Sequence, residues 1–291
     1  MSVAVLLPTR RTEAWKYSDL RAALGDAPPA LREGRDIIEQ LAPKTDVFEV
    51  AAGERRLVVE RLEEGGPLAA QASEWRIGEG GALTRIVIQR GAAPTLSMAR
   101  VRVARGAQFR QFVLAEGAKL ARIETHVQAA GEGAQVELNG AYLVAEGRHA
   151  DLTSVIEHSA PASATRQLIK GVARKGGRGV FQGKIVVERA AQKTDARQYH
   201  HGLLLQDGAE IFAKPELMIY ADDVQCAHGN TAGGLDERAL FYMRSRGVPE
   251  AEARALLIES FLVETIPADL PEDIEQELVG RIRDWLRGGA A

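Results

Sequence analysis

The sequence has 291 residues, 45% hydrophobic and 26% charged, and 37 basic against 40 acidic residues leave a net charge of −3. These values fit a globular chain with a proper core, without the basic excess of a nucleic-acid binder or the run of ~18 apolar residues that a membrane span needs. The single cysteine excludes an intrachain disulfide and fits a reducing compartment, so we expect a cytoplasmic protein with no nucleic-acid or membrane partner.

Periodicity divides the chain into three zones. Residues 1–55 are predicted to be partly helical, residues 56–234 form a mainly β core, and residues 235–291 are helical. In the middle zone, short segments rich in β-branched residues are bounded by glycine, for example 83–88, 120–127 and 184–187. The absence of amphipathic helices between them argues against a doubly wound α/β fold.

A glycine–alanine pair recurs through the β zone. A small pair before a strand suits a tight corner, because glycine tolerates a positive φ. Such corners are typical of a β-solenoid, but also of hairpin turns in a sandwich, which Asn139–Gly140 and Asp207–Gly208 favour. The pattern alone leaves both folds open. The pairs are Gly91–Ala92, Gly106–Ala107, Gly117–Ala118, Gly133–Ala134 and Gly208–Ala209.

The third zone predicts three helices. Asp236 is the expected N-cap of a helix over 237–246, which Gly247 ends, and Pro249 begins the next helix. A last helix follows Pro271.

Apolar stripes on these helices serve the core or a partner. In the middle helix the apolar residues occupy more than one face, so we expect Leu256, Leu257 and Phe261 to dock a partner protein. The middle stripe comprises Ala253, Leu256, Leu257, Phe261 and Val263, and the last comprises Ile274, Leu278, Ile282, Trp285 and Leu286.

Nucleotide and hydrolase motifs are missing from the sequence. Gly183–Lys184 is followed by Ile185, where a phosphate loop needs serine or threonine. No HExxH, CxxC or GxSxG occurs. We therefore expect no nucleotide bound by this chain and no catalytic residues.

One cysteine and one histidine are spaced for a shared site. Cys226 and His228 are two residues apart, so in a strand they face the same way. Sulfur and imidazole suit iron, zinc or copper, yet two ligands do not complete such a site. His200 and His201 are adjacent and should face opposite sides, so only one of them can contribute. The alternative is an inert, buried cysteine.

Several segments resemble the SufB/SufD family of iron–sulfur cluster assembly proteins, and its SufD branch in particular. Segment 11–20 (RTEAWKYSDL) is similar to the family's entry motif, and Cys226 to Gly229 (CAHG) fits the SufD form. The remaining segments are 193–205 (KTDARQYHHGLLL), 214–217 (KPEL), 219–229 (IYADDVQCAHG), 235–237 (LDE), 240–242 (LFY), 244–247 (RSRG) and 252–253.

The resemblance implies a right-handed parallel β-helix flanked by helical regions. It implies a noncatalytic scaffold subunit that pairs with SufB through its last coils and docks the ATPase SufC through residues 235–291. His228, with Cys226 and then His200, becomes the candidate ligand for iron or a transient iron–sulfur cluster shared with SufB.

Two other function classes remain open. A β-solenoid enzyme acting on polysaccharide would need paired carboxylates in a groove, and the adjacent Asp222 and Asp223 diverge in a strand. A purely structural protein would bury Cys226 and His228 as packing groups. A homodimer of the isolated chain is also compatible with the sequence.

Overall fold

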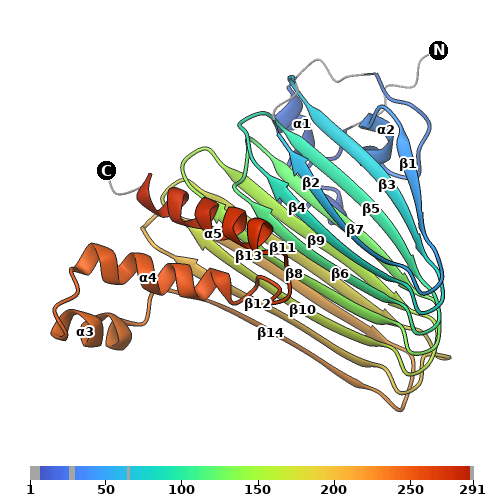
Figure 1. Ribbon diagram of the computed structural model, residues 1–291. Helices are drawn as coiled ribbons and strands as arrows, with labels where there is room; N and C mark the ends of the chain where they lie inside the picture. Colours follow the sequence, from blue (N-terminus) through green and yellow to red (C-terminus); the bar gives the residue numbers. More distant parts are fainter. Residues whose placement is uncertain (1–6, 26–29, 64–65, 289–291) are drawn as a thin grey trace.

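Two parallel β-sheets of seven strands each form the body of the protein (Figure 1). A computed structural model describes residues 7–25, 30–63 and 66–288. Sheet A contains β1 (Thr45–Val50), β3 (Ala69–Ile77), β5 (Thr95–Val103), β7 (Ala121–Ala129), β9 (His149–His158), β11 (Arg178–Val187) and β13 (Glu210–Ile219). Sheet B contains β2 (Arg55–Leu62), β4 (Ala82–Gln89), β6 (Gln108–Ala115), β8 (Gln135–Val144), β10 (Ala164–Ala173), β12 (Asp195–Leu204) and β14 (Gln225–Gly233).

Successive strands alternate between the sheets, so that each coil adds one strand to each. This confirms the parallel β-helix. Sheet A begins at Thr45, ahead of the predicted zone boundary at residue 56. Whether the three zones are separate folding units stays a prediction.

The glycine–alanine pairs lie at the corners of the coils. Gly106 has a φ of +63° and Gly133 a φ of +71°, values that are strained for residues with a Cβ. The dipeptides that favoured hairpins have other roles. Asn139–Gly140 lies inside β8, and Asp207–Gly208 joins β12 to β13, which belong to different sheets. All the paired strands are parallel, so the sandwich alternative is wrong.

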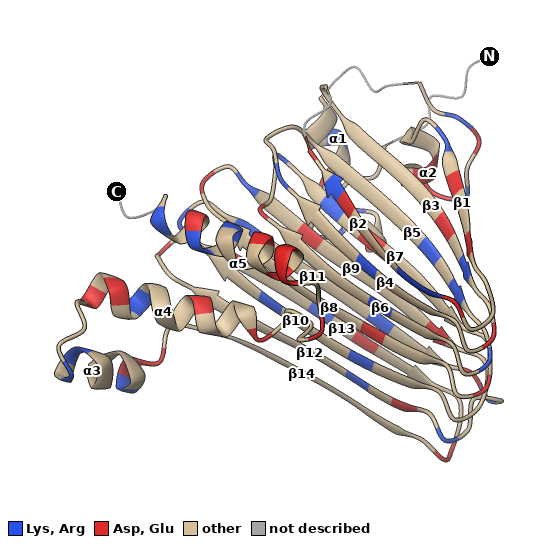
Figure 2. Ribbon diagram, in the orientation of Figure 1, with Lys and Arg blue, Asp and Glu red and all other residues tan. Residues whose placement is uncertain are grey.

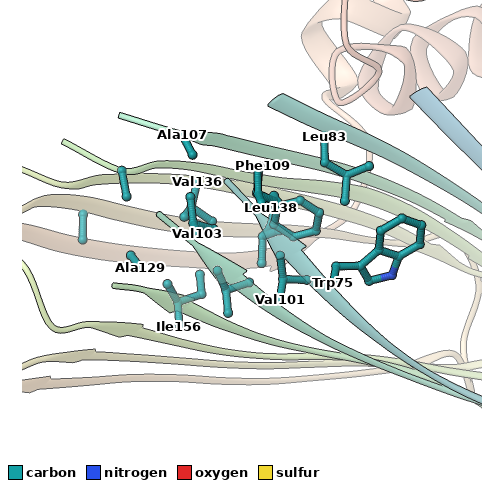
Figure 3. Packing of buried hydrophobic residues seen from close by; sticks show 14 of the residues in the cluster. Trp75, Leu83, Val101, Val103, Ala107, Phe109, Ala129, Val136, Leu138 and Ile156 are labelled. Atoms are coloured by element: carbon teal, nitrogen blue, oxygen red, sulfur yellow. The ribbon is translucent and has the colours of Figure 1, made fainter. Parts of the chain in front are cut away.

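The interior between the sheets is filled by stacked rows of side chains. Register places Leu83, Phe109 and Val136 above one another on the inner face of sheet B, and Trp75, Val101 and Ile156 lie in a facing row of sheet A (Figure 3). Because residues i and i+2 share a face, alternate positions are apolar, and this narrow packing needs few aromatic rings.

The N-terminal segment lies against the outer face of sheet A. It includes the 3-10 turn Glu13–Trp15, α1 (Leu20–Leu24) and α2 (Ile37–Leu41). The indole of Trp15 covers the guanidinium of Arg122 at 4.2 Å, and the Ser18 hydroxyl donates to Asp151 at 2.5 Å. This segment therefore covers a buried ion pair.

Three helices follow the solenoid: α3 (Glu237–Ser245), α4 (Glu250–Val263) and α5 (Glu272–Arg287). The Asp236 carboxylate caps α3 as predicted, accepting from two backbone amides. Helix α5 lies on the outer face of sheet B and buries the predicted Ile274, Leu278, Ile282 and Leu286. Of the predicted α4 stripe Ala253 is buried, but the other buried residues of α4 are Ile258 and Leu262, because α5 and the sheet cover a different face. In the described residues no helix is long and apolar enough to cross a membrane.

Candidate functional site at the solenoid mouth

Cys226 and His228 lie on β14, the edge strand of sheet B. Register pairs Cys226 with Ala196 and His228 with Gln198, both fully buried, so the two predicted ligands face the solenoid interior. Strand β14 ends its sheet, so no further strand of the described chain covers them. Strand β14 also lacks charged side chains (Figure 2).

Strand β13 forms the facing wall of this last coil. Its register partners below include the buried Phe181 and Ile185, so Ala213 and Leu217 continue two inner rows. We call the surface formed by Ala213, Leu217, Cys226, His228 and Asn230 the mouth. It joins an apolar wall to a wall with sulfur, imidazole and amide groups.

Cys226 and His228 differ in exposure. Cys226 is partly buried and packs against the hydrophobic interior, whereas His228 is exposed. Burial raises the pKa of the Cys226 thiol. The thiol is therefore protonated at neutral pH, and a metal would have to displace that proton in order to bind.

A buried acceptor lies below His228. Gln198 donates from its amide nitrogen to Gln167 at 2.9 Å, while its Oε1 is buried without a partner among the described residues. A ligating histidine usually donates its other N–H to a neighbouring oxygen. Gln198 Oε1 is an oxygen of that kind, in the adjacent register position.

His200 and His201 face opposite sides of β12, as predicted. His200 is fully buried, and its two nitrogens lie 2.9 Å from Tyr142 Oη and 2.7 Å from Asn230 Oδ1. It would have to give up one of these hydrogen bonds in order to bind iron. His201 faces outward and contacts Thr231 Oγ1 at 2.7 Å.

The chain alone brings two strong metal donors together. Among the described residues, no three of His, Cys, Asp and Glu are close enough to hold a metal ion. Iron–sulfur clusters are usually held by four side chains. The mouth can therefore supply part of such a site, with the other ligands coming from elsewhere.

The predicted docking residues of α4 have unequal exposure. Leu256 is 44% exposed, Leu257 is partly buried, and Phe261 lies under the Lys170 ammonium at 4.5 Å. Sequence patterning missed the neighbouring α3, where Phe241 is 72% and Tyr242 60% exposed. The available sequence signal was the pair of adjacent aromatic residues, Phe241 and Tyr242, in the helix that Asp236 caps.

Comparison with known proteins identifies a family whose model matches most of this chain. A family model described as the SufBD core domain of SUF-system FeS cluster assembly matches residues 39–261. The SufD iron–sulfur cluster assembly protein of Escherichia coli is 36% identical over 174 residues, or 60% of this chain and 41% of that protein.

Two further relatives match similar shares. A SufBD family protein of Synechocystis is 36% identical over 67% of this chain and 43% of its own length. The chloroplastic protein ABCI7 of Arabidopsis thaliana is 38% identical over 58% of this chain and 36% of its own length. The chain thus spans about two fifths of the length of these relatives.

Proposed function

The chain belongs to the SufBD family of iron–sulfur cluster assembly proteins, and we propose that it is a noncatalytic scaffold subunit whose mouth holds iron or a nascent cluster as cargo. In this role Cys226 and His228 supply part of the ligand set. A SufB-type partner supplies the rest.

The observation that carries this proposal is the position of the two donors at an unpaired end. Strands β13 and β14 are both edge strands, whose free backbone groups suit pairing with another chain. Exposed apolar residues lie at the end of β13 and just after it: Met218 is 39%, Ile219 42% and Tyr220 51% exposed. A partner that covers this patch would bring its own ligands to Cys226 and His228.

A SufC-type ATPase is the proposed partner of α3 and α4. Phe241, Tyr242 and Leu256 are exposed large apolar residues on these two contacting helices. Gly183–Lys184–Ile185 lies inside β11, not in a loop before a helix, and so does not have the setting of a phosphate-binding loop. ATP hydrolysis is therefore assigned to the partner.

Complex formation tests the scaffold role. The full chain is mixed with purified SufB-type and SufC-type proteins, and native mass spectrometry measures the assemblies. Met218→Glu, in the exposed apolar patch at the end of β13, should reduce the SufB-containing species. The matched control, Val47→Glu, places the same charge on a 55% exposed apolar residue of β1 at the opposite end and should not. Equal assembly by both variants, or none by the wild type, would count against the proposal.

A further inference from the structure

Tyr142 occupies a space made by two glycines inside the solenoid. It is fully buried on β8, and a Cβ built on Gly171 or Gly179 would overlap its ring. Its hydroxyl lies 2.9 Å from His200 Nε2. The hydroxyl stays protonated, because burial raises its pKa.

His200 continues the hydrogen-bond chain to the mouth. Its ring stacks on Phe181 at 5.2 Å with an interplanar angle of 7°, and its Nδ1 lies 2.7 Å from Asn230 Oδ1. The ring is fully buried and both of its nitrogens face uncharged groups, so it is held as the neutral imidazole.

One proton arrangement satisfies all three residues. An amide oxygen only accepts, so Nδ1 must carry the imidazole proton, and Nε2 must accept from Tyr142. In the reverse arrangement the Tyr142 hydroxyl proton would be buried without an acceptor. The chain therefore runs in one direction, from Tyr142 through His200 to Asn230.

The direction of the hydrogen-bond chain determines which atom of the Asn230 amide faces His200. Its Oδ1 is turned toward His200, which leaves Nδ2 on the other branch of the amide, with no hydrogen-bond partner among the described residues. Asn230 is exposed and shares the inner face of β14 with Cys226 and His228.

We propose that Tyr142 and His200 are positioning residues that make Asn230 an N–H donor at the mouth, so that the mouth favours sulfide-bearing, anionic cargo over a bare iron cation. The inference rests on the proposed function, because it concerns the same site. Amide N–H groups stabilise sulfide and thiolate charge, whereas an amide oxygen would favour the cation.

Asn230→Asp tests the polarity directly. Aspartate has the same shape and keeps an acceptor for His200, but replaces the N–H donor with a carboxylate oxygen. The full chain, assembled with its SufB-type and SufC-type partners, is titrated with Co²⁺ as the cation probe and, separately, with tetrathiomolybdate as a soluble sulfide dianion. We expect the variant to bind Co²⁺ about tenfold more tightly and tetrathiomolybdate about tenfold more weakly, as for a charged hydrogen bond gained or lost.

Thr231→Asp is the matched control. It adds the same charge one residue further along β14, on the outward face, and should shift both affinities far less. Tyr142→Phe removes the hydroxyl that donates to His200 Nε2, and ¹⁵N NMR should show that His200 loses its single Nδ1–H tautomer. The affinity for Co²⁺ should then rise and the affinity for tetrathiomolybdate should fall.

The outcomes separate the two claims. A wild type that binds neither probe overturns the proposed cargo site and this inference with it. A wild type that binds both, with Asn230→Asp unchanged or matched by Thr231→Asp, overturns only the role of Asn230. A His200 ring in the Nε2–H tautomer overturns the direction of the hydrogen-bond chain from Tyr142 to Asn230.

Discussion

The ring of Tyr142 fills the space where a side chain on Gly171 would lie. Gly171→Ala should therefore overpack the interior and lower the free energy of unfolding by about 1–3 kcal/mol. Urea denaturation measures this change.

Gly280→Ala is the opposite case for the same substitution. Gly280 lies within α5 with open space around its Cα, so alanine should raise the free energy of unfolding by about 0.5–1 kcal/mol. Similar changes for both variants would contradict the packing of Tyr142.

The buried guanidinium of Arg122 joins two acidic side chains on the outer face of sheet A. It contacts Asp151 at 2.8 Å and Glu124 at 2.7 Å, beneath Trp15. Arg122→Met should leave the fully buried carboxylate of Asp151 without its ion-pair partner and cost about 3 kcal/mol or more.

Arg105→Met removes an exposed ion pair with Glu79 and should change stability by less than about 0.5 kcal/mol. The two variants are compared by chemical denaturation. An equally small loss for Arg122→Met would show that the network does not depend on this cation.

Stability should fall on mild acidification through His158. Its ring nitrogens contact Ser163 at 2.7 Å and Thr165 at 2.9 Å, and burial lowers its pKa from 6.5 to about 4. Between pH 6.5 and 4 the unfolded chain binds a proton that the folded chain excludes, so stability decreases as pH falls.

Integrating these two pKa values gives a loss of about 2 kcal/mol between pH 7 and pH 5 from this group. His158→Gln should reduce the pH-dependent loss, measured from unfolding curves at the two pH values. His201→Gln, on the outward face, should leave most of the loss in place. An unaltered slope in His158→Gln would contradict a neutral, buried His158.

Leu256 on α4 should contribute to binding of a SufC-type ATPase. Leu256→Asp is expected to weaken this binding by about tenfold or more, because it places a charge in an apolar contact, while the melting temperature stays near that of the wild type. Leu57→Asp, on a 40% exposed leucine of β2, is the control. Calorimetric titration with equal affinities for both variants would exclude α4 from the interface.

The sequence predicted those elements whose signals, such as a helix cap or the spacing of apolar residues, lie within the element itself. Asp236 caps α3 through its own next residues, and the spacing of Ile274 and Leu278 alone identifies the buried face of α5. Which of the three predicted docking residues of α4 is exposed could not be predicted, because the face that α4 buries depends on where α5 and sheet B lie.

In the candidate site, too, some features follow from neighbouring residues and others depend on tertiary packing. The shared face of Cys226 and His228 follows from strand geometry. The chain from Tyr142 through His200 to Asn230 links strands far apart in the sequence, and only the coil register brings them together. Such cross-coil contacts leave no periodic signal in the sequence.

The most direct measurement of the central claim is the iron affinity of the assembled complex, determined anaerobically by competition with a chelator. With SufB-type and SufC-type partners present, His228→Ala should lower this affinity about tenfold or more, because one ligand at the mouth is lost. His201→Ala, which removes an imidazole from the outward face of the neighbouring strand, should retain the wild-type affinity. Equal iron affinity in the wild type and His228→Ala would contradict a cargo site at the mouth.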